Sequence, residues 1–134
     1  PGVPLLYNGQ EADLDKRLEF FKRDPIEWKE TELTPFYTKL VHLRTSHPAL
    51  RHGVEGGSYD VLKTNQKSVV AYKRVKGESE VLTILNMSSK PVTVALKDGA
   101  TAGTYTDIFT DAGVEIAQGK QIQLEPWGYL VLVK

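Results

Sequence analysis

The sequence predicts a mainly β protein, a Greek-key antiparallel β-sandwich preceded by a helical segment. Two observations lead to this prediction. Hydrophobic residues recur with a helical period before Gly53 and alternate with a period of two after it. The region after Gly53 also holds short apolar runs separated by turns that contain glycine, asparagine and serine. Strands spaced by about 8–12 residues are typical of sandwiches and Greek-key barrels. The candidate strands cover residues 59–64, 68–74, 81–86, 92–96, 103–108, 114–116, 121–124 and 128–133.

The first residues predict the end of a buried strand. Residues 3–7 (VPLLY) form an apolar run, and Asn8-Gly9 provides a turn that stops it. A buried parallel strand needs neighbours on both edges and helices on both faces. No strand or helix precedes this run, so we expect the chain to be the tail of a larger protein. Residues 13–22 are expected to hold a short helix or a turn.

One long helix is predicted after Thr34. Thr34 can cap it, and Pro35 suits the first helical position because its missing N–H would be unpaired there in any case. Apolar residues at positions 36, 37, 40, 41 and 43 form a one-sided stripe. Pro48 ends the helix, because it moves His47 out of the helical region.

Composition excludes several classes of partner. Lys plus Arg and Asp plus Glu both number 17, so the net charge is zero. The balance is local, with eight basic and eight acidic residues in 1–53 and nine of each in 54–134. Neither part has the basic surface that nucleic acid requires.

Cysteine is absent, which excludes disulfides and thiolate metal sites. No apolar stretch of eighteen residues is present, so we expect no membrane span.

Two groups of residues with metal-binding side chains have a simpler explanation. Glu11, Asp13 and Asp15 could bind calcium, but an EF-hand loop would need glycine where Leu18 stands. Acidic residues after a strand are also common in turns and first helical turns. Three histidines are spaced by five residues, which turns successive side chains by about 140° on a helix and does not give a zinc pair. We therefore expect no metal site in this chain. These histidines are His42, His47 and His52.

Trp127 and Tyr129 are candidates for stacking on sugar rings. They lie two positions apart and share a face if residues 128–133 are extended. Exposed aromatic side chains at a sandwich can stack on the C–H face of a sugar. A strand that is apolar on both faces is, however, usually buried. Core packing is therefore the competing interpretation for both residues.

Several phrases of the sequence resemble the α-amylase family, glycoside hydrolase family thirteen. GVPLLYNGQE is similar to the last strand of the family's catalytic barrel, and KRDPIEWKE to the loop that follows it, with Ile26 and Lys29 departing from the family pattern. FYTKLVHLRTSHPALRHG resembles the closing barrel helix. VVAYKR, VLTILNMSSKPVTV and LEPWGYLVLV resemble strands of the C-terminal β-sandwich domain. The matching positions are Gly2, Pro4, Tyr7, Gly9, Glu11, Arg23, Asp24, Pro25, Trp28, Tyr37, Leu40, Leu43, Arg44, His47, Pro48, Ala49, Leu50, Asn86, Pro126, Trp127 and Gly128.

The resemblance implies a division of the chain. Residues 1–53 would be a remnant of a catalytic (β/α)₈ barrel, consisting of its last strand, a loop and the closing helix. Residues 54–134 would be a C-terminal sandwich that supports the barrel. The intact enzyme would act on an α-glucan or maltodextrin at α-1,4 bonds with retained configuration, and calcium could bind to it.

The resemblance also implies that this chain holds no catalytic residue. Retaining glycosidases need two carboxyl groups about 5–5.5 Å apart, and in this family they come from earlier strands. Glu11 is the only acid in a plausible strand-end position, so the chain alone should not hydrolyse glycosidic bonds. The substrate rim would be formed by Gly9, Gln10, Glu11, Arg23 and Trp28.

Two alternatives stay open. The chain could be a stand-alone carbohydrate-binding sandwich, with Tyr59, Tyr72 or Tyr105 beside Trp127 on an aromatic platform. It could also be a structural domain with no ligand. If the chain is the tail of a larger protein, its apolar N-terminal segment must bury itself against something else. We therefore expect contact with its own sandwich or self-association with a second copy.

Overall fold

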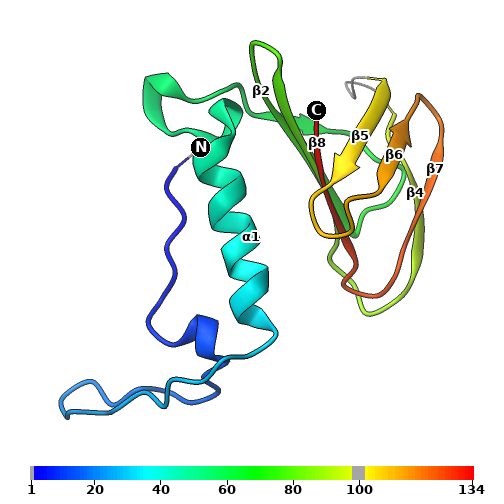
Figure 1. Ribbon diagram of the computed structural model, residues 1–134. Helices are drawn as coiled ribbons and strands as arrows, with labels where there is room; N and C mark the ends of the chain where they lie inside the picture. Colours follow the sequence, from blue (N-terminus) through cyan, green and yellow to red (C-terminus); the bar gives the residue numbers. More distant parts are fainter. Residues whose placement is uncertain (1, 98–101) are drawn as a thin grey trace.

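The computed structural model describes residues 2–97 and 102–134 and has three parts (Figure 1). Residues 2–32 form an irregular segment, here called the N-terminal arm. Helix α1 covers Leu33–Ser46. A β-sandwich follows and extends to the end of the chain, and α1 lies between the N-terminal arm and the sandwich.

The sandwich contains strands at all the predicted places, with ends that differ from the predicted ones by no more than two residues. Among the described residues they are β1 (Asp60–Leu62), β2 (Val69–Lys76), β3 (Ser79–Asn86), β4 (Val92–Ala95), β5 (Gly103–Asp107), β6 (Gly113–Ile116), β7 (Gln121–Leu124) and β8 (Tyr129–Val133). The predicted antiparallel sandwich is confirmed, because every strand pair in both sheets is antiparallel.

The two sheets differ in size. The large sheet has the order β1-β2-β3-β8-β5-β6, and the small one pairs β4 with β7. An isolated bridge between Thr64 and Leu96 links them. The chain passes between the sheets before and after both β4 and β7, and such crossings are typical of Greek-key folds. The register of the central pair places Leu82 opposite Leu132 and Leu85 opposite Tyr129.

Alternation along the strands builds the core between the sheets. Leu82 and Ile84 of β3 and Leu132 of β8 have no exposed surface and point to the inner side. Val94 and Leu124 of the small sheet close this core from the opposite side. Burying each such side chain stabilises the fold by about 1.5–3 kcal/mol, so the sandwich has an ordinary hydrophobic core of its own.

The outer side of the large sheet is also apolar, and α1 covers part of it. Val81 and Val131 pack with Leu43 of α1 and with Ala49, which lies in the 3₁₀ turn η2 (Pro48–Leu50) after the helix. Lys39 fastens the middle of α1 to the turn after β5, because its Nζ donates to the carbonyls of Ile108 and Phe109, each at 3.1 Å.

The helix begins earlier than predicted and ends as predicted. It starts at Leu33, so the expectation that Thr34 caps it is wrong. The Thr31 hydroxyl instead accepts the Leu33 N–H at 3.2 Å, and Thr34, already helical, donates its hydroxyl to the Glu11 carbonyl at 3.2 Å. At the other end His47 is extended, with φ −98° and ψ 117°, directly before Pro48.

The predicted strand at residues 3–7 is absent. These residues form no strand, and Val3, Leu5 and Tyr7 are 68%, 83% and 62% exposed. A strand exists only where a neighbour supplies hydrogen-bond partners, and none of the described strands lies beside this run. Pro4 does reach the sandwich, since it lines a groove together with Tyr72 and Val81. Pro4 is thus a point at which the expected contact with the sandwich forms.

The part of the arm after Asn8 is mostly irregular. A short 3₁₀ turn, η1 (Gln10–Ala12), follows Gly9, and a third 3₁₀ turn, η3 (Gly53–Glu55), precedes the sandwich. Residues 13–22 hold turns and no helix, so of the two options for this stretch the turn is correct. Phe20 and Phe21 project from it and are 91% and 94% exposed.

Candidate functional site

The turn at Gly9 is the first place where the resemblance puts functional residues. Gly9 is buried and has a φ of +92°, a conformation that favours glycine. A Cβ at this position would lie 2.9 Å from the Leu14 side chain. Gln10 folds back, so that its Oε1 accepts the Tyr7 N–H at 2.7 Å. The chain therefore forms a tight turn that is closed by the Gln10 side chain, and a residue other than glycine would not fit well at position 9.

Glu11 faces inward rather than out to solvent. Its backbone carbonyl accepts the hydroxyls of Thr31 and Thr34, which ties η1 to the beginning of α1. Its carboxylate oxygen Oε2 is buried and has no hydrogen-bond partner among the described residues. A buried carboxylate oxygen without a partner is unfavourable, so Glu11 is held in a position that suits a donor from outside the described residues.

A hollow of about 350 Å³ lies beside this turn. It brings together two predicted rim residues, Gly9 and Gln10, and adds the basic side chains of Lys16 and Arg17, which the sequence analysis did not single out. The other predicted rim residues, Glu11, Arg23 and Trp28, do not line it. The lining residues are Tyr7, Asn8, Gly9, Gln10, Leu14, Lys16, Arg17 and Leu18.

Arg23 and Trp28 are both exposed, and the residue between them with a clear role is Asp24. Asp24 Oδ1 lies 2.5 Å from Lys16 Nζ, and Oδ2 accepts the Glu19 N–H at 3.0 Å. The hydrogen bond from Lys16, helped by the Glu19 N–H, lowers the pKa of Asp24 below its usual value of 3.8. Asp24 thus closes the loop that carries Phe20 and Phe21.

Trp127 and Tyr129 do not share a face. Trp127 lies in the turn before β8 with φ +58° and is 63% exposed. Tyr129 is the first residue of β8 and packs against α1, with ring centroids 5.7 Å from Phe36 and 5.1 Å from Phe109. The core-packing interpretation is therefore wrong for Trp127, while Tyr129 forms part of an aromatic cluster on the outer side of the sheet.

The wider aromatic platform considered for the binding-module alternative does not form. Tyr105 is 1% exposed, and its hydroxyl donates to buried Glu80 Oε1 at 2.9 Å. Tyr59 and Tyr72 do lie together, with ring centroids 5.3 Å apart. Alternation along β5 places Tyr105 in the core, so it cannot also face a ligand.

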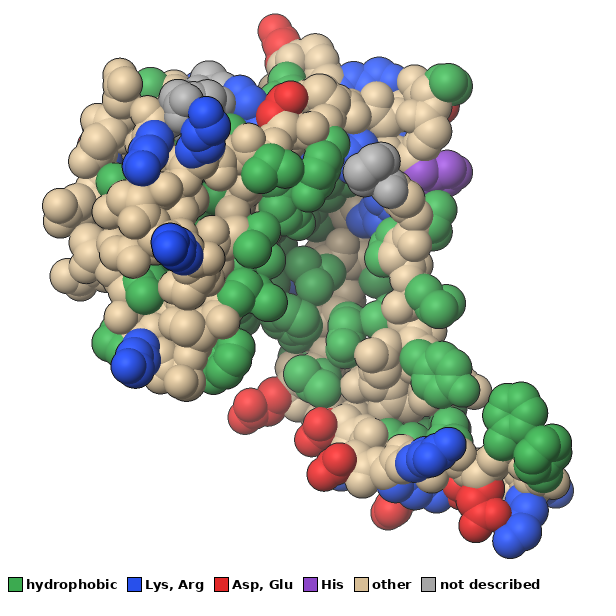
Figure 2. All heavy atoms as spheres, turned by 180° about the vertical axis from the view of Figure 1, so that it is seen from behind, with side chains coloured by type: hydrophobic (Ala, Val, Ile, Leu, Met, Phe, Trp, Pro, Cys, Tyr) green, Lys and Arg blue, Asp and Glu red, His purple; other side chains and the backbone are tan. Residues whose placement is uncertain are grey.

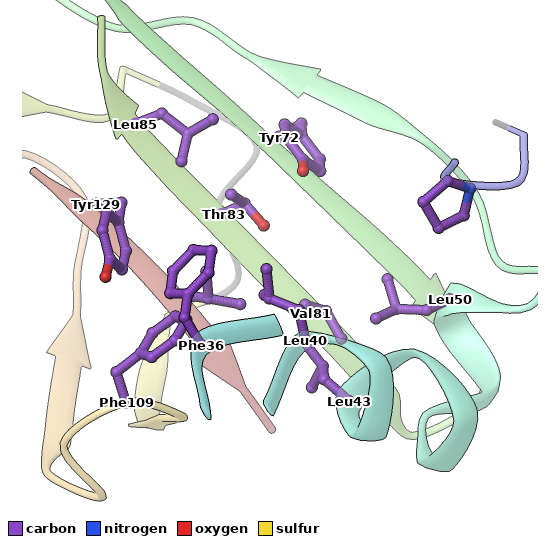
Figure 3. Close-up of a pocket in the computed structure, with 12 residues that line it drawn as sticks. Phe36, Leu40, Leu43, Leu50, Tyr72, Val81, Thr83, Leu85, Phe109 and Tyr129 are labelled. Carbon is purple, nitrogen blue, oxygen red and sulfur yellow. The ribbon is translucent and has the colours of Figure 1, made fainter. Parts of the chain in front are cut away.

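An apolar groove lies between α1 and the outer side of the large sheet, with a volume of about 390 Å³. Figure 3 shows Phe36, Leu40 and Leu43 of α1 pointing toward Val81, Thr83 and Leu85 of β3. Figure 2 shows hydrophobic side chains gathered along the hollow between the sandwich and the helical part of the molecule. The sequence analysis missed this groove, although β3 and β8 are apolar on both faces and thus gave a signal for it. Its lining is Pro4, Phe36, Leu40, Leu43, Leu50, Tyr72, Val81, Thr83, Leu85, Phe109, Tyr129 and Val131.

Within residues 2–97 and 102–134, no three His, Asp or Glu side chains come together in a way that could hold a metal ion. The three histidines therefore do not form a joint site in the part of the chain that the structure describes. No helix among these residues is long and apolar enough to cross a bilayer.

The fold is an antiparallel β-sandwich with one helix packed on the outer face of its large sheet. Residues 59–131 match the family described as Maltogenic Amylase, C-terminal domain, and the chain belongs to this family. The resemblance found in the sequence is thereby confirmed.

Curated relatives agree with this assignment. Alpha-amylase 2 of Dictyoglomus thermophilum is 28% identical over 121 residues, which are 81% of this chain and 19% of that protein. Alpha-amylase MalA of Haloarcula japonica is 35% identical over 108 residues, which are 78% of this chain and 15% of that protein. The chain spans 15–19% of the length of these two relatives.

A solved structure shows the same fold. A maltogenic alpha-amylase, AmyB from Thermotoga neapolitana, superposes with a TM-score of 0.82 at 24% identity. The alignment covers 99% of this chain and 33% of that one, so it includes the N-terminal arm and α1 as well as the sandwich.

Proposed function

We propose that this chain acts as the C-terminal part of an α-amylase-like glycoside hydrolase that works on α-1,4-glucans. Residues 54–134 brace a catalytic (β/α)₈ barrel, and residues 1–53 supply the barrel's last strand, a loop and its closing helix. The family match, which begins at residue 59, supports this division. The names of the relatives, which are α-amylases, support the substrate class.

The observation that supports the bracing role is that α1 carries apolar residues on two sides. One side of the helix packs on Val81 and Val131 of the large sheet. Its other side lines a second hollow, of about 380 Å³, through Tyr37 and Val41 together with Leu6 of the N-terminal arm. A helix with apolar residues on two sides is suited to lie between two layers of a protein. The sandwich supplies one layer, and the barrel would supply the other.

The rim residues belong to the same proposal. Gly9, Gln10 and Glu11 would lie at the substrate rim, with Arg23 and Trp28 on the following loop. The buried oxygen of Glu11 supports this placement, because it needs a donor that the described residues do not provide. A calcium site of the intact enzyme would draw its ligands from residues upstream of this chain.

The test is to read the coding frame upstream of residue 1 and to compare the longer product with this chain. We expect a barrel with two catalytic carboxylates, and release of sugar from maltoheptaose by the longer product only. A start codon directly before residue 1 would contradict the proposal, and so would hydrolysis by the 134-residue chain alone.

Self-association is a second consequence of the exposed apolar surface. Val3 and Leu5 of the N-terminal arm, with Val41 of α1, are at least half exposed. Without a covering barrel, these residues would favour contact between copies of the chain. Light scattering at high concentration should detect a dimer or larger species. A monomer under these conditions would contradict this part of the proposal.

A further inference from the structure

Trp127 has an unusual backbone conformation for a bulky side chain. Its φ of +58° lies in the left-handed region, which residues other than glycine, asparagine and aspartate adopt rarely. Such a conformation persists only where the surrounding structure fixes it, and it is found preferentially at functional sites.

A buried asparagine fixes this turn. Asn86 is 2% exposed, and its Nδ2 donates to the carbonyls of Lys90 and Glu125 at 2.7 and 2.8 Å. The Asn86 N–H donates to the Gly128 carbonyl at 2.8 Å, and the Trp127 N–H donates to Ser88 at 2.9 Å. Hydrogen bonds on both sides therefore hold the Trp127 backbone in place.

The indole itself contributes little to the core. It is 63% exposed, whereas Leu124, before the turn, and Val131, after it, are buried. A turn built only for stability would place glycine or asparagine at this φ. The fold instead keeps a large, rigid aromatic surface in solvent at a strained position, which points to a ligand for that surface.

The turn lies at the same end of the molecule as the proposed substrate rim. Figure 1 shows β8 starting at the end where α1 begins. Tyr129, two residues after Trp127, contacts Phe36, and Thr34 bonds to the carbonyl of Glu11. Phe36 and Thr34 are neighbours in the first turns of α1. Trp127 and the proposed rim therefore both lie toward the end of the molecule where α1 begins.

Several polar side chains near the turn are exposed, together with the apolar Met87. Ser89, Lys90 and Glu125 are all exposed, and the carbonyls of the latter two are held by Asn86. A glucose unit has apolar C–H faces and an edge of hydroxyl groups. An aromatic face can stack on the C–H face, while neighbouring hydroxyl and charged side chains can bond to the hydroxyl groups.

We propose that Trp127 is an auxiliary binding position for α-glucan chains, on the sandwich and outside the catalytic barrel. The proposal deepens the proposed function and rests on it for the substrate class. The indole stacks on one glucose unit, and Lys90 and Glu125 bond to its hydroxyls.

The experiment uses the 134-residue chain, which has only two tryptophans, Trp28 and Trp127. Each gives one indole N–H signal in a nitrogen-15 NMR spectrum, and single replacement by phenylalanine assigns them. We expect maltoheptaose to shift the Trp127 signal in a saturable manner, and cellohexaose, its β-linked counterpart, to leave it unchanged. No shift of this signal, or an equal shift with both sugars, would overturn the proposal.

Trp127→Asn separates binding from folding. Asparagine tolerates the left-handed region, so we expect an unchanged or higher melting temperature and an affinity for maltoheptaose weakened about tenfold or more. Tyr59→Ala, at an exposed aromatic residue elsewhere on the sandwich, should keep the affinity. A lower melting temperature for Trp127→Asn would mean that the indole is structural, and loss of a dimer in this variant would mean that it binds a second copy. Either result would overturn the proposal. Neither depends on the barrel-bracing role, which the upstream reading frame tests separately.

Discussion

The sandwich and the N-terminal arm use apolar residues in opposite ways. Leu82 and Ile84 of the sandwich have no exposed surface, whereas Leu5 and Phe20 of the arm are 83% and 91% exposed. Sandwich strands pair with one another over long registers, while the hydrogen bonds of the arm are mainly local. The sandwich therefore carries its own core, whereas many apolar side chains of the arm are not covered by the described residues.

The largest expected effect compares the same substitution in the two regions. Leu82→Ala would leave a cavity in the fully buried core, and we expect a loss of about 2–5 kcal/mol in the free energy of unfolding. Leu5→Ala should change it by no more than about 0.5 kcal/mol, because the side chain is already in solvent. Urea unfolding of both variants measures the difference. If both substitutions lower the free energy of unfolding by the same amount, the sandwich core and the arm do not differ in burial in this way.

Asn86→Ala tests whether turns in the sandwich are fixed by buried polar groups. The variant leaves the carbonyls of Lys90 and Glu125 without their donor, and we expect a loss of about 1–3 kcal/mol. Asn65→Ala is the matched control, since Asn65 is exposed and its side chain accepts one hydrogen bond, from the Ala95 N–H, among the described residues. In thermal unfolding, the melting temperature of Asn86→Ala should be clearly lower than that of Asn65→Ala. A lower melting temperature for the control would argue against a central role for Asn86.

Lys39→Met probes the contact between the regions. The variant removes two hydrogen bonds to the turn after β5 but keeps an apolar stem over Phe109. We expect a loss of about 0.5–1.5 kcal/mol, seen mainly as faster amide exchange in α1. If amide exchange in β3 becomes faster by the same factor as in α1, the helix and the sandwich unfold as one unit.

The smallest expected effect is confined to the arm and depends on pH. The pKa of Asp24 is lowered in the folded chain, so its contribution is present above about pH 3.8, the value for an unperturbed group, and is lost as the pH falls through the lower folded value. Protection of the Glu19 amide, which donates to Asp24, should decrease over this range. In Asp24→Asn, the protection of the Glu19 amide should not decrease in this way as the pH falls. If the decrease persists in this variant, a group other than Asp24 causes it.

The strands could be predicted from the sequence because each is short, alternating and bounded by turn residues, and because the neighbours that it needs lie in the same chain. Residues 3–7 have an equally clear apolar pattern but lack a partner among the described strands, so the pattern alone predicted a strand that does not form. Thr34 has a residue type that suits a cap, but the helix begins at Leu33 with Glu32 at the N-cap position, and the Thr31 hydroxyl accepts the Leu33 N–H. The position of the first helical turn decides between these possibilities, and the local sequence does not specify it.

The candidate sites were less predictable for a related reason. The tight turn at Gly9 follows from its sequence, but the inward position of Glu11 depends on Thr31 and Thr34, twenty or more residues away. The local sequence does not predict the left-handed φ of Trp127, because the glycine that would favour this conformation stands at position 128 and not at 127. It follows from hydrogen bonds made by Asn86, which the chain brings to this turn from β3.

Hydrogen exchange of the complete 134-residue chain tests the contrast between the two regions most directly. We expect amides of β2, β3 and β8 to exchange only through global unfolding. Amides of residues 2–31 should exchange much faster, with partial protection only for those that donate within the arm's own turns, such as Glu19. Comparable protection in both regions would contradict the account, because the arm would then have a stable core of its own and would need no further surface to cover it.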